Sequence, residues 1–231
     1  MSSVTNGKRY YLVSGATGTI GKQVVKLLLD KGYGVAAITR NSKLGKKSFF
    51  KDDIFWANFD YENNEIPLGN KNPFHEILKK QKFFGSFHCA GAYHNGDPGK
   101  LTIEDYSFAM KANLFSAINI VKYSLSMVEP SNSIVVLNSQ ASVAAAQSEV
   151  AYGVSKRALS AYIDGMQMEA TRQKLQLVNV LCGAVQSPMV NSRNEYENFI
   201  EVSELADLLI KISEAGSSLR IKNIEVLRRN Y

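Results

Sequence analysis

A tyrosine and a lysine four residues apart are the first candidates for chemistry in this chain. Tyr152 and Lys156 lie in the stretch AYGVSKRAL, residues 151–159, which has the pattern of an amphipathic helix. A free phenol has a pKa of about 10 and a free lysine one of about 10.4, so neither is an efficient acid or base at neutral pH. A cation one helical turn away favours the phenolate and lowers the phenol pKa. The spacing predicts an acid/base pair, although two unrelated side chains on a helix surface would give the same pattern.

A glycine-rich turn near the start of the chain is the second candidate. The stretch SGATGTIG, residues 14–21, stands between an apolar run and a helical pattern. In this place Gly15 permits a tight turn, Gly18 lets the backbone approach a ligand, and Gly21 lets the helix pack closely on the sheet. The free N–H groups of the helix start would then bind a pyrophosphate. A plain strand-to-helix turn is the alternative.

The residues at the end of the next apolar run distinguish NAD from NADP as the possible cofactor. The stretch YGVAAITR, residues 33–40, is followed by Asn41 and by no acidic residue that would hold the ribose 2′-hydroxyl of NAD. Arg40 instead offers paired donors and a fixed charge to a 2′-phosphate. The sequence therefore favours NADP(H), with a merely solvated arginine as the alternative.

The elements that must hold these residues alternate along the chain. Short apolar runs predict strands at 9–15, 33–40, 54–60, 85–91, 132–139, 175–183 and 222–229. Helical patterns lie between them, at 21–32, 72–83, 102–129, 150–174 and 202–212. Apolar strands separated by helices indicate a parallel sheet covered on both faces. We expect an α/β fold of the doubly wound Rossmann type, with about seven strands in three α/β/α layers, and a single domain over 1–231.

Composition narrows the class of protein. The chain has 231 residues, 45% of them hydrophobic and 21% charged, which is enough for one sizeable core. The net charge of +6 includes the basic run RNSKLGKK, residues 40–47, which is too short and too poor in aromatics for a nucleic-acid surface. A small anionic ligand or a solvated surface explains it better.

Features that the sequence lacks bear on the location of the protein, on disulfide formation and on metal binding. No run approaches eighteen apolar residues and no signal peptide is apparent, so we expect a cytoplasmic protein without a membrane span. Cys89 and Cys182 should end strands two positions apart in the sheet, too far for a disulfide. The three histidines show no ligand spacing with them, so we expect no metal site.

Six segments, in order along the chain, resemble the short-chain dehydrogenase/reductase family in its short-subunit branch. They are the glycine turn, FDY at 59–61, CAG at 89–91, KANLFSAINI at 111–120, LNSQAS at 137–142 and YGVSK at 152–156. The last is the family's Tyr-x-x-x-Lys, and Ser139 precedes Tyr152 by thirteen residues, as is usual there. The resemblance runs from about residue 9 to 227.

The resemblance implies a role for each matching residue. Tyr152 would exchange a proton with the substrate oxygen, while Lys156 would lower its pKa and bind the nicotinamide ribose. Ser139 would polarise the substrate oxygen, and Asn113 would support a water chain behind Lys156. Further cofactor contacts would come from Gly15, Thr17, Gly18, Thr19, Ile20, Gly21, Arg40, Asp60, Tyr61, Ala90, Gly91, Val185 and Ser187.

The chain also departs from the family pattern. His88 stands where the family usually has asparagine, and Cys182 replaces the usual proline before Gly183. The second glycine of the turn lies one place earlier than in most short subunits, a spacing typical of larger epimerase-like members. The changes at His88 and Cys182 remove no group that handles the proton.

We therefore expect an NADP(H)-dependent oxidoreductase that reduces a small ketone or aldehyde, or oxidises the corresponding alcohol. The alternatives are a catalytically silent NADP(H)-sensing regulator or scaffold, which the intact Ser139, Tyr152 and Lys156 disfavour, and a nucleotide-sugar epimerase, which the chain length opposes. The substrate pocket should be built by 142–150, 188–199, Tyr93 and His94. The resemblance implies a homodimer or homotetramer formed through the two long helices.

Overall fold

Seven parallel strands form one sheet in the computed structural model, which describes residues 7–41, 43, 53–60, 62–191, 196–216 and 218–229. The spatial order is β3-β2-β1-β4-β5-β6-β7. The strands are β1 Tyr10–Ser14, β2 Gly34–Thr39, β3 Ile54–Asn58, β4 Gly85–His88, β5 Ser133–Ser139, β6 Gln176–Cys182 and β7 Asn223–Val226. The predicted fold class, a parallel sheet with helices on both sides, is confirmed.

The strands form where the sequence is apolar without alternation. Every residue of β1 and β2 is buried, as is every residue of β4. A strand covered on both faces has no solvent side, so continuous apolar runs replace the alternating pattern of an exposed sheet. The sheet therefore separates two hydrophobic clusters, one on each face.

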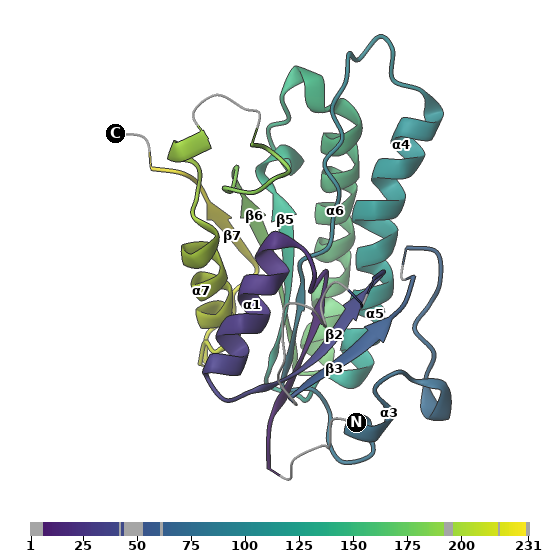
Figure 1. Cartoon of the computed structure of the whole chain (residues 1–231), viewed down its shortest axis with the longest axis vertical. Helices are drawn as coiled ribbons and strands as arrows, with labels where there is room; N and C mark the ends of the chain where they lie inside the picture. The colour runs from purple at the N-terminus through teal and green to yellow at the C-terminus, as the bar shows by residue number, and fades with distance from the viewer. Residues whose placement is uncertain are drawn as a thin grey trace.

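Five main helices cover the two faces (Figure 1). α1 (Thr19–Asp30) and α7 (Val202–Ser213) contact one another and cover one face. α4 (Ile103–Met110), α5 (Ser116–Met127) and α6 (Val150–Arg172) cover the other face. Short helical turns complete the described chain: η1 Gly69–Lys71, α3 His75–Leu78, η3 Gln140–Ser142, η4 Gln147–Glu149 and η5 Tyr196–Asn198.

The helix predicted over 102–129 is interrupted. A capping box between Thr102 and Asp105 starts α4, and a π-helical turn, η2 (Lys111–Phe115), separates α4 from α5. Single π turns inside helices are often found at functional sites, because they turn one side chain out of the regular spacing. Here that turn contains Asn113, and the apolar periodicity alone did not predict it. The helix predicted over 72–83 shortens to four residues.

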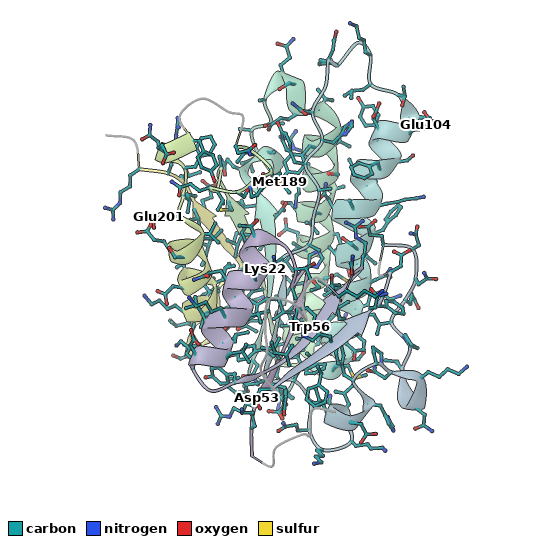
Figure 2. The ribbon with its side chains drawn as sticks, in the orientation of Figure 1. Lys22, Asp53, Trp56, Glu104, Met189 and Glu201 are labelled. Carbon is teal, nitrogen blue, oxygen red and sulfur yellow. The ribbon has the colours of Figure 1, made fainter. Side chains whose placement is uncertain are left out.

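The strand order reverses between β1 and β4. The chain proceeds outward from β1 to β3, then returns to the other side of β1 and proceeds outward again from β4. In open parallel sheets such a reversal leaves a crevice at the carboxyl ends of the strands, where ligands bind. Figure 2 places Met189, which follows β6, at this end of the sheet and Asp53, which precedes β3, at the opposite end.

Candidate active site

A cavity of about 320 Å³ opens at the carboxyl end of the sheet. It brings together predicted site residues from six different parts of the chain: Ile20, Ala90 and Gly91, Asn113, Ser139, Tyr152 and Lys156, Val185 and Ser187. Parallel strands end at the same edge, so residues distant in sequence converge there. The predicted residues Gly15, Thr17, Gly18, Thr19, Gly21, Arg40 and Asp60 do not line this cavity.

Ser139 and Tyr152 lie next to one another on the wall of the cavity. Ser139 is the last residue of β5, Tyr152 lies in the first turn of α6, and their side chains form a hydrogen bond. Asn138 fixes this arrangement: its Oδ1 accepts from the Ser139 amide at 2.8 Å, and its Nδ2 donates to Ser160 Oγ on α6 at 2.8 Å. One buried amide thus ties the end of the strand to the helix that carries Tyr152.

Lys156 lies one turn further along α6. Its Nζ is 5.7 Å from the centre of the Tyr152 ring, and the residue is only 4% exposed. Burial lowers the pKa of Lys156 to about 8, because removal from water disfavours the ammonium, while Cys182 nearby opposes the shift. The cation predicted from the spacing therefore lies inside the protein and not on a helix surface.

The pKa of Tyr152 differs in direction from the sequence-based expectation. Burial raises this pKa to about 12, the hydrogen bond with Ser139 lowers it, and Glu149 raises it further. We expected Lys156 to lower the pKa of the phenol, but the cost of burying a phenolate outweighs the favourable contacts around it. The Tyr152 hydroxyl is accordingly protonated at neutral pH in this structure.

The π turn holds Asn113 where its side chain forms three hydrogen bonds, to the loop after β4 and to α6. Its Oδ1 accepts from the Ala92 amide at 2.9 Å, and its Nδ2 donates to the Ala92 carbonyl at 2.9 Å and to Ser155 Oγ at 3.0 Å. Gly91 fits beside it because a Cβ there would lie 2.8 Å from Asn113 Oδ1 and 3.4 Å from Lys156 Nζ. The side chain therefore ties the loop after β4 to α6.

The glycine turn fits a diphosphate. Gly15 has a φ of +69°, and a Cβ on it would lie 2.6 Å from the Ala90 amide nitrogen. A Cβ on Gly21 would lie 2.2 Å from the Gly15 carbonyl oxygen. No side chain caps α1 at Gly18, and no acidic residue lies in its first turn. The helix start therefore keeps amide donors and a positive dipole end for an anion.

The end of β2 carries the residues expected at the adenosine end of a cofactor. Thr39 Oγ1 lies 2.8 Å from Thr17 Oγ1 and links β2 to the glycine turn. The next residue, Arg40, has a side chain 61% exposed and forms an ion pair of 2.9 Å with Glu62. We expected no acid near this strand end, yet the loop after β3 supplies one. Asp60 in that loop is exposed, and Tyr61 lies outside the described residues.

His88 fills the place of the family's asparagine beneath the site. The residue is buried, and its Nδ1 forms a 2.7 Å hydrogen bond with Ser14 Oγ that joins β4 to β1. Its Nε2 is buried and has no hydrogen-bond partner in the described structure. Burial, and to a lesser degree the charge of Lys156, lower the pKa of His88 to about 3. His88 is therefore a neutral link between two central strands.

Parts of the segments predicted to build the substrate pocket line this cavity. Tyr93, Ala144, Met189 and Val190 line the cavity, whereas His94 does not and pairs with Asp105 at 2.9 Å. Residues 192–195 of the predicted pocket segment lie outside the described residues. The residue that the sequence reasoning did not single out is Glu149, a carboxylate in the cavity. The sequence did carry a signal for this residue, because Glu149 is the one acidic residue in the otherwise uncharged stretch 142–150.

The structure also bears on the predictions about a disulfide, a metal site and a membrane span. Cys89 and Cys182 are both free thiols and line the cavity. Among the described residues, no group of three or more His, Cys, Asp or Glu is placed to hold a metal ion. Within the same part of the chain, no helix has the length and hydropathy needed to cross a membrane.

The arrangement suits proton exchange beside a bound dinucleotide. A phenol, a serine hydroxyl and a buried ammonium line a cavity whose floor is formed by the strand ends, next to a helix start without a cap. Hydride transfer from a nicotinamide needs such a site, because the protein has only to orient the two reactants and to handle the proton.

Comparison with known proteins agrees with this geometry. A family model described as short chain dehydrogenase matches residues 9–198. The chain is 32% identical over 119 residues to the photosystem II assembly factor Ycf39 of Cyanophora paradoxa, a match that covers 49% of this chain and only 36% of that protein. It is 23% identical to an NADPH-dependent 1-acyldihydroxyacetone phosphate reductase of Schizosaccharomyces pombe, covering 87% of this chain and 76% of that one.

A solved structure supports the same fold. A short chain dehydrogenase family protein from Francisella tularensis superimposes with a TM-score of 0.77 at 21% identity, over 95% of this chain and 98% of the other. The match of the family model to most of the sequence, together with this architecture, establishes the relationship. The chain belongs to the short-chain dehydrogenase/reductase family, whose members are oxidoreductases that use nicotinamide cofactors.

Proposed function

We propose that this protein is an NADP(H)-dependent reductase of a small ketone or aldehyde, with Tyr152 as the acid/base. The observation that carries the proposal is the meeting of Ser139, Tyr152 and Lys156 in one cavity beside Gly91 and Val185. Bound NADPH would supply the hydride, which is chemistry that no side chain here provides. The rest of the reaction depends on how these side chains hold the substrate and move its proton.

In reduction, the substrate oxygen would lie between two hydroxyl groups. Ser139 would donate a hydrogen bond to the oxygen that gains charge, and Tyr152 would transfer its proton to it. The raised pKa of Tyr152 keeps this proton in place at neutral pH, which suits the reductive direction. Lys156 would bind the nicotinamide ribose hydroxyls and return a proton toward Tyr152. Asn113 would hold the loop and the helix on either side of this path.

The remaining cofactor contacts would come from other residues near the carboxyl edge of the sheet. Amides of the α1 start, at Thr19, Ile20 and Gly21, would bind the pyrophosphate beside Gly15, Thr17 and Gly18. Ala90 and Gly91 would border the adenosine ribose, while Asp60 and Tyr61 would lie beside the adenine. Val185 and Ser187 would flank the nicotinamide carboxamide. Arg40 would bind the 2′-phosphate, which is the basis for NADP over NAD.

The test is turnover in a matched pair of variants. NADPH oxidation with a panel of small ketones and aldehydes should fall at least about a hundredfold in Tyr152→Phe, because a positioned acid is typically worth about 10² to 10⁴ in rate. Tyr162→Phe is the control, since its phenol is on the same helix, donates to the Ile118 carbonyl at 3.5 Å and does not line the cavity. Both variants should bind NADPH as the wild type does. Full activity in Tyr152→Phe would refute the acid/base assignment.

The catalytically silent regulator is not favoured. One relative is named an assembly factor, but a regulator has no need of Ser139, Tyr152 and Lys156 in one cavity. We propose that residues 1–231 form one nucleotide-binding domain. The cytoplasmic location and the absence of a metal remain predictions.

We also propose self-association through α4 and α6, which lie side by side in Figure 1. Exposed apolar side chains lie along them: Phe108 of α4 and Phe115 of the following turn η2 are 48% and 43% exposed, and Val154 and Met168 of α6 are 47% and 73% exposed. Large exposed apolar side chains that gather on one surface mark an interaction site. Sedimentation should show a dimer or tetramer in the wild type and a monomer in Val154→Glu. A wild-type monomer would contradict the proposal.

A further inference from the structure

A second cavity, of about 340 Å³, lies at the end of the sheet opposite to the active site. It is bounded by the end of α6, the first residues of β6 and the segment 219–222 that precedes β7. β6 runs from Gln176 in this cavity to Cys182 in the active site, a length of about 20 Å at a rise of about 3.3 Å per residue. Among the described residues, none lines both cavities. The second cavity is therefore separate from the proposed catalytic site.

The charged side chains on this second cavity all have the same sign. Three cations line it, Lys174, Arg220 and Lys222, and none of the described lining residues is acidic. None of these three side chains forms an ion pair with a described residue. Glu169, an acid near the end of α6, is instead held by Arg172 at 2.7 Å. Cations that gather on one cavity without a carboxylate favour an anionic ligand, to which they can donate charge-assisted hydrogen bonds.

The uncharged polar side chains of the second cavity leave donors available. Gln176 Oε1 accepts from the Ile221 amide at 3.0 Å, so this side chain has only its N–H groups to offer a ligand. Gln167 donates to two main-chain carbonyls, at 3.2 and 3.1 Å, and its Oε1 is buried from solvent. Thr171 donates its hydroxyl to the Gln167 carbonyl at 2.8 Å, while the Ser131 hydroxyl has no partner among the described residues. The polar part of the lining is therefore suited to a ligand that accepts hydrogen bonds.

The backbone of the second cavity is strained at two residues that face one another. Lys174 follows α6 with a φ of +59°, in the left-handed conformation for which glycine is the usual residue after a helix. Ser131 has a φ of +69°, and its amide donates to the Lys174 carbonyl at 2.6 Å. In the described part of the chain these are the only residues other than glycine with a positive φ, and both line this cavity. Residues held in such conformations cluster at ligand sites, because folding alone does not favour them.

Apolar side chains form the rest of the lining: Leu175, Leu177, Leu219 and Ile221. Leu175 and Leu177 are buried, whereas Leu219 is 57% exposed. A ligand with an apolar part would remove this exposed leucine from water, which is favourable in proportion to the area covered. The cavity therefore suits a molecule that carries an anionic group and a short apolar body.

We propose that the second cavity binds a phosphate monoester with a short apolar substituent, at the same time as a dinucleotide occupies the active site. The phosphate would bind Lys174, Arg220 and Lys222, and the substituent would lie against the apolar lining. Three cations match a dianion better than a carboxylate, and the planar guanidinium of Arg220 can donate to two phosphate oxygens at once. This binding site goes beyond the proposed reductase function and does not depend on it.

Calorimetric titration of the full chain with butyl phosphate, at low ionic strength, tests the proposal. We expect one site per chain, with and without saturating NADPH, and weaker binding of inorganic phosphate and of butanol. The double variant Arg220→Gln, Lys222→Gln should bind butyl phosphate at least about tenfold more weakly, because it loses two charge-assisted contacts. Lys174→Gly should also weaken binding, yet be no less stable in a denaturant titration, since glycine adopts the left-handed conformation without strain.

Lys211→Gln is the matched control, because Lys211 is an exposed lysine of α7 that pairs with Asp207 and lines neither cavity. It should bind butyl phosphate as the wild type does, and all the variants should keep the wild-type affinity for NADPH. Three results would overturn the proposal: no saturable binding of butyl phosphate, unchanged affinity in the double variant, or displacement by NADPH, which would place the phosphate in the dinucleotide crevice. A failure to reduce any ketone would contradict the proposed function and leave this site unaffected.

Discussion

The two ends of the proposed dinucleotide site are built on opposite principles. At the catalytic end, Tyr152 and Lys156 are drawn into the protein, and burial dominates the pKa of both. At the adenosine end, Arg40 stands largely in solvent, with Glu62 as its ion-pair partner. Burial makes the first end sensitive to the loss of a single group, whereas exposure makes the second adjustable at small cost. One fold can therefore fix its chemistry at a buried end and still vary its cofactor preference at an exposed one.

Among the changes at the exposed end, removal of Arg40 should have the largest effect on cofactor preference. Hydrogen bonds to charged groups contribute about 1.5–3 kcal/mol, so Arg40→Ala should weaken NADPH binding about tenfold or more and leave NADH binding nearly unchanged. Titration with each cofactor, followed by nicotinamide fluorescence, measures both affinities. Arg172→Ala is the control, since it removes an arginine from a surface ion pair on α6. Equal wild-type affinities for the two cofactors would remove the case for NADP.

The buried end should make the free energy of unfolding depend on pH through His88, the buried histidine beneath the site. Its pKa is about 3 in the folded state, against about 6.5 in an unfolded chain. Below pH 6.5 the unfolded state therefore binds a proton that the native state does not, and stability falls as the pH falls toward 3. The maximal slope is about 1.4 kcal/mol per pH unit.

Between pH 7 and pH 5 the wild type should thus lose about 2 kcal/mol more free energy of unfolding than His88→Asn does. Denaturant titrations at the two pH values provide the comparison. His75→Asn, at a partly exposed histidine in α3, should follow the wild type. A His88→Asn variant with the wild-type pH dependence would show that His88 is protonated in the folded protein.

The smallest effect on NADPH affinity is expected at Glu62, and the direction of the change is what tests the comparison. Glu62 holds Arg40 at 2.9 Å and so competes with an incoming phosphate for the same guanidinium. Exposed pairs contribute up to about 1 kcal/mol, so Glu62→Gln should tighten NADPH binding by a factor of about two to five. NADH binding should not change. Glu214→Gln breaks another surface pair, with Lys31, and should affect neither cofactor. Weaker NADPH binding in Glu62→Gln would mean that Glu62 orients Arg40 for the phosphate.

Much of the fold was predictable because buried parallel strands leave a direct trace in the sequence. The apolar runs at 9–15 and 132–139 match β1 and β5 closely, since burial on both faces requires apolar residues throughout. Helix lengths were less predictable. The prediction over 72–83 gave only a four-residue helix, and the one over 102–129 missed the π turn, because side-chain hydrogen bonds decide such local geometry and periodicity does not record them.

The chemical groups of the site and the fold class could be predicted from the chain alone: the phenol–lysine spacing, the glycine turn, Arg40 after the second strand and the alternation of strands and helices that gives a parallel sheet. These depend on local spacing and on the period of apolar residues, both of which a single chain records. The folded arrangement was needed to learn that burial raises the pKa of Tyr152, that Glu62 reaches Arg40, and that Glu149 lines the cavity. Those properties depend on distance from water and from charges remote along the chain, and no local pattern encodes either.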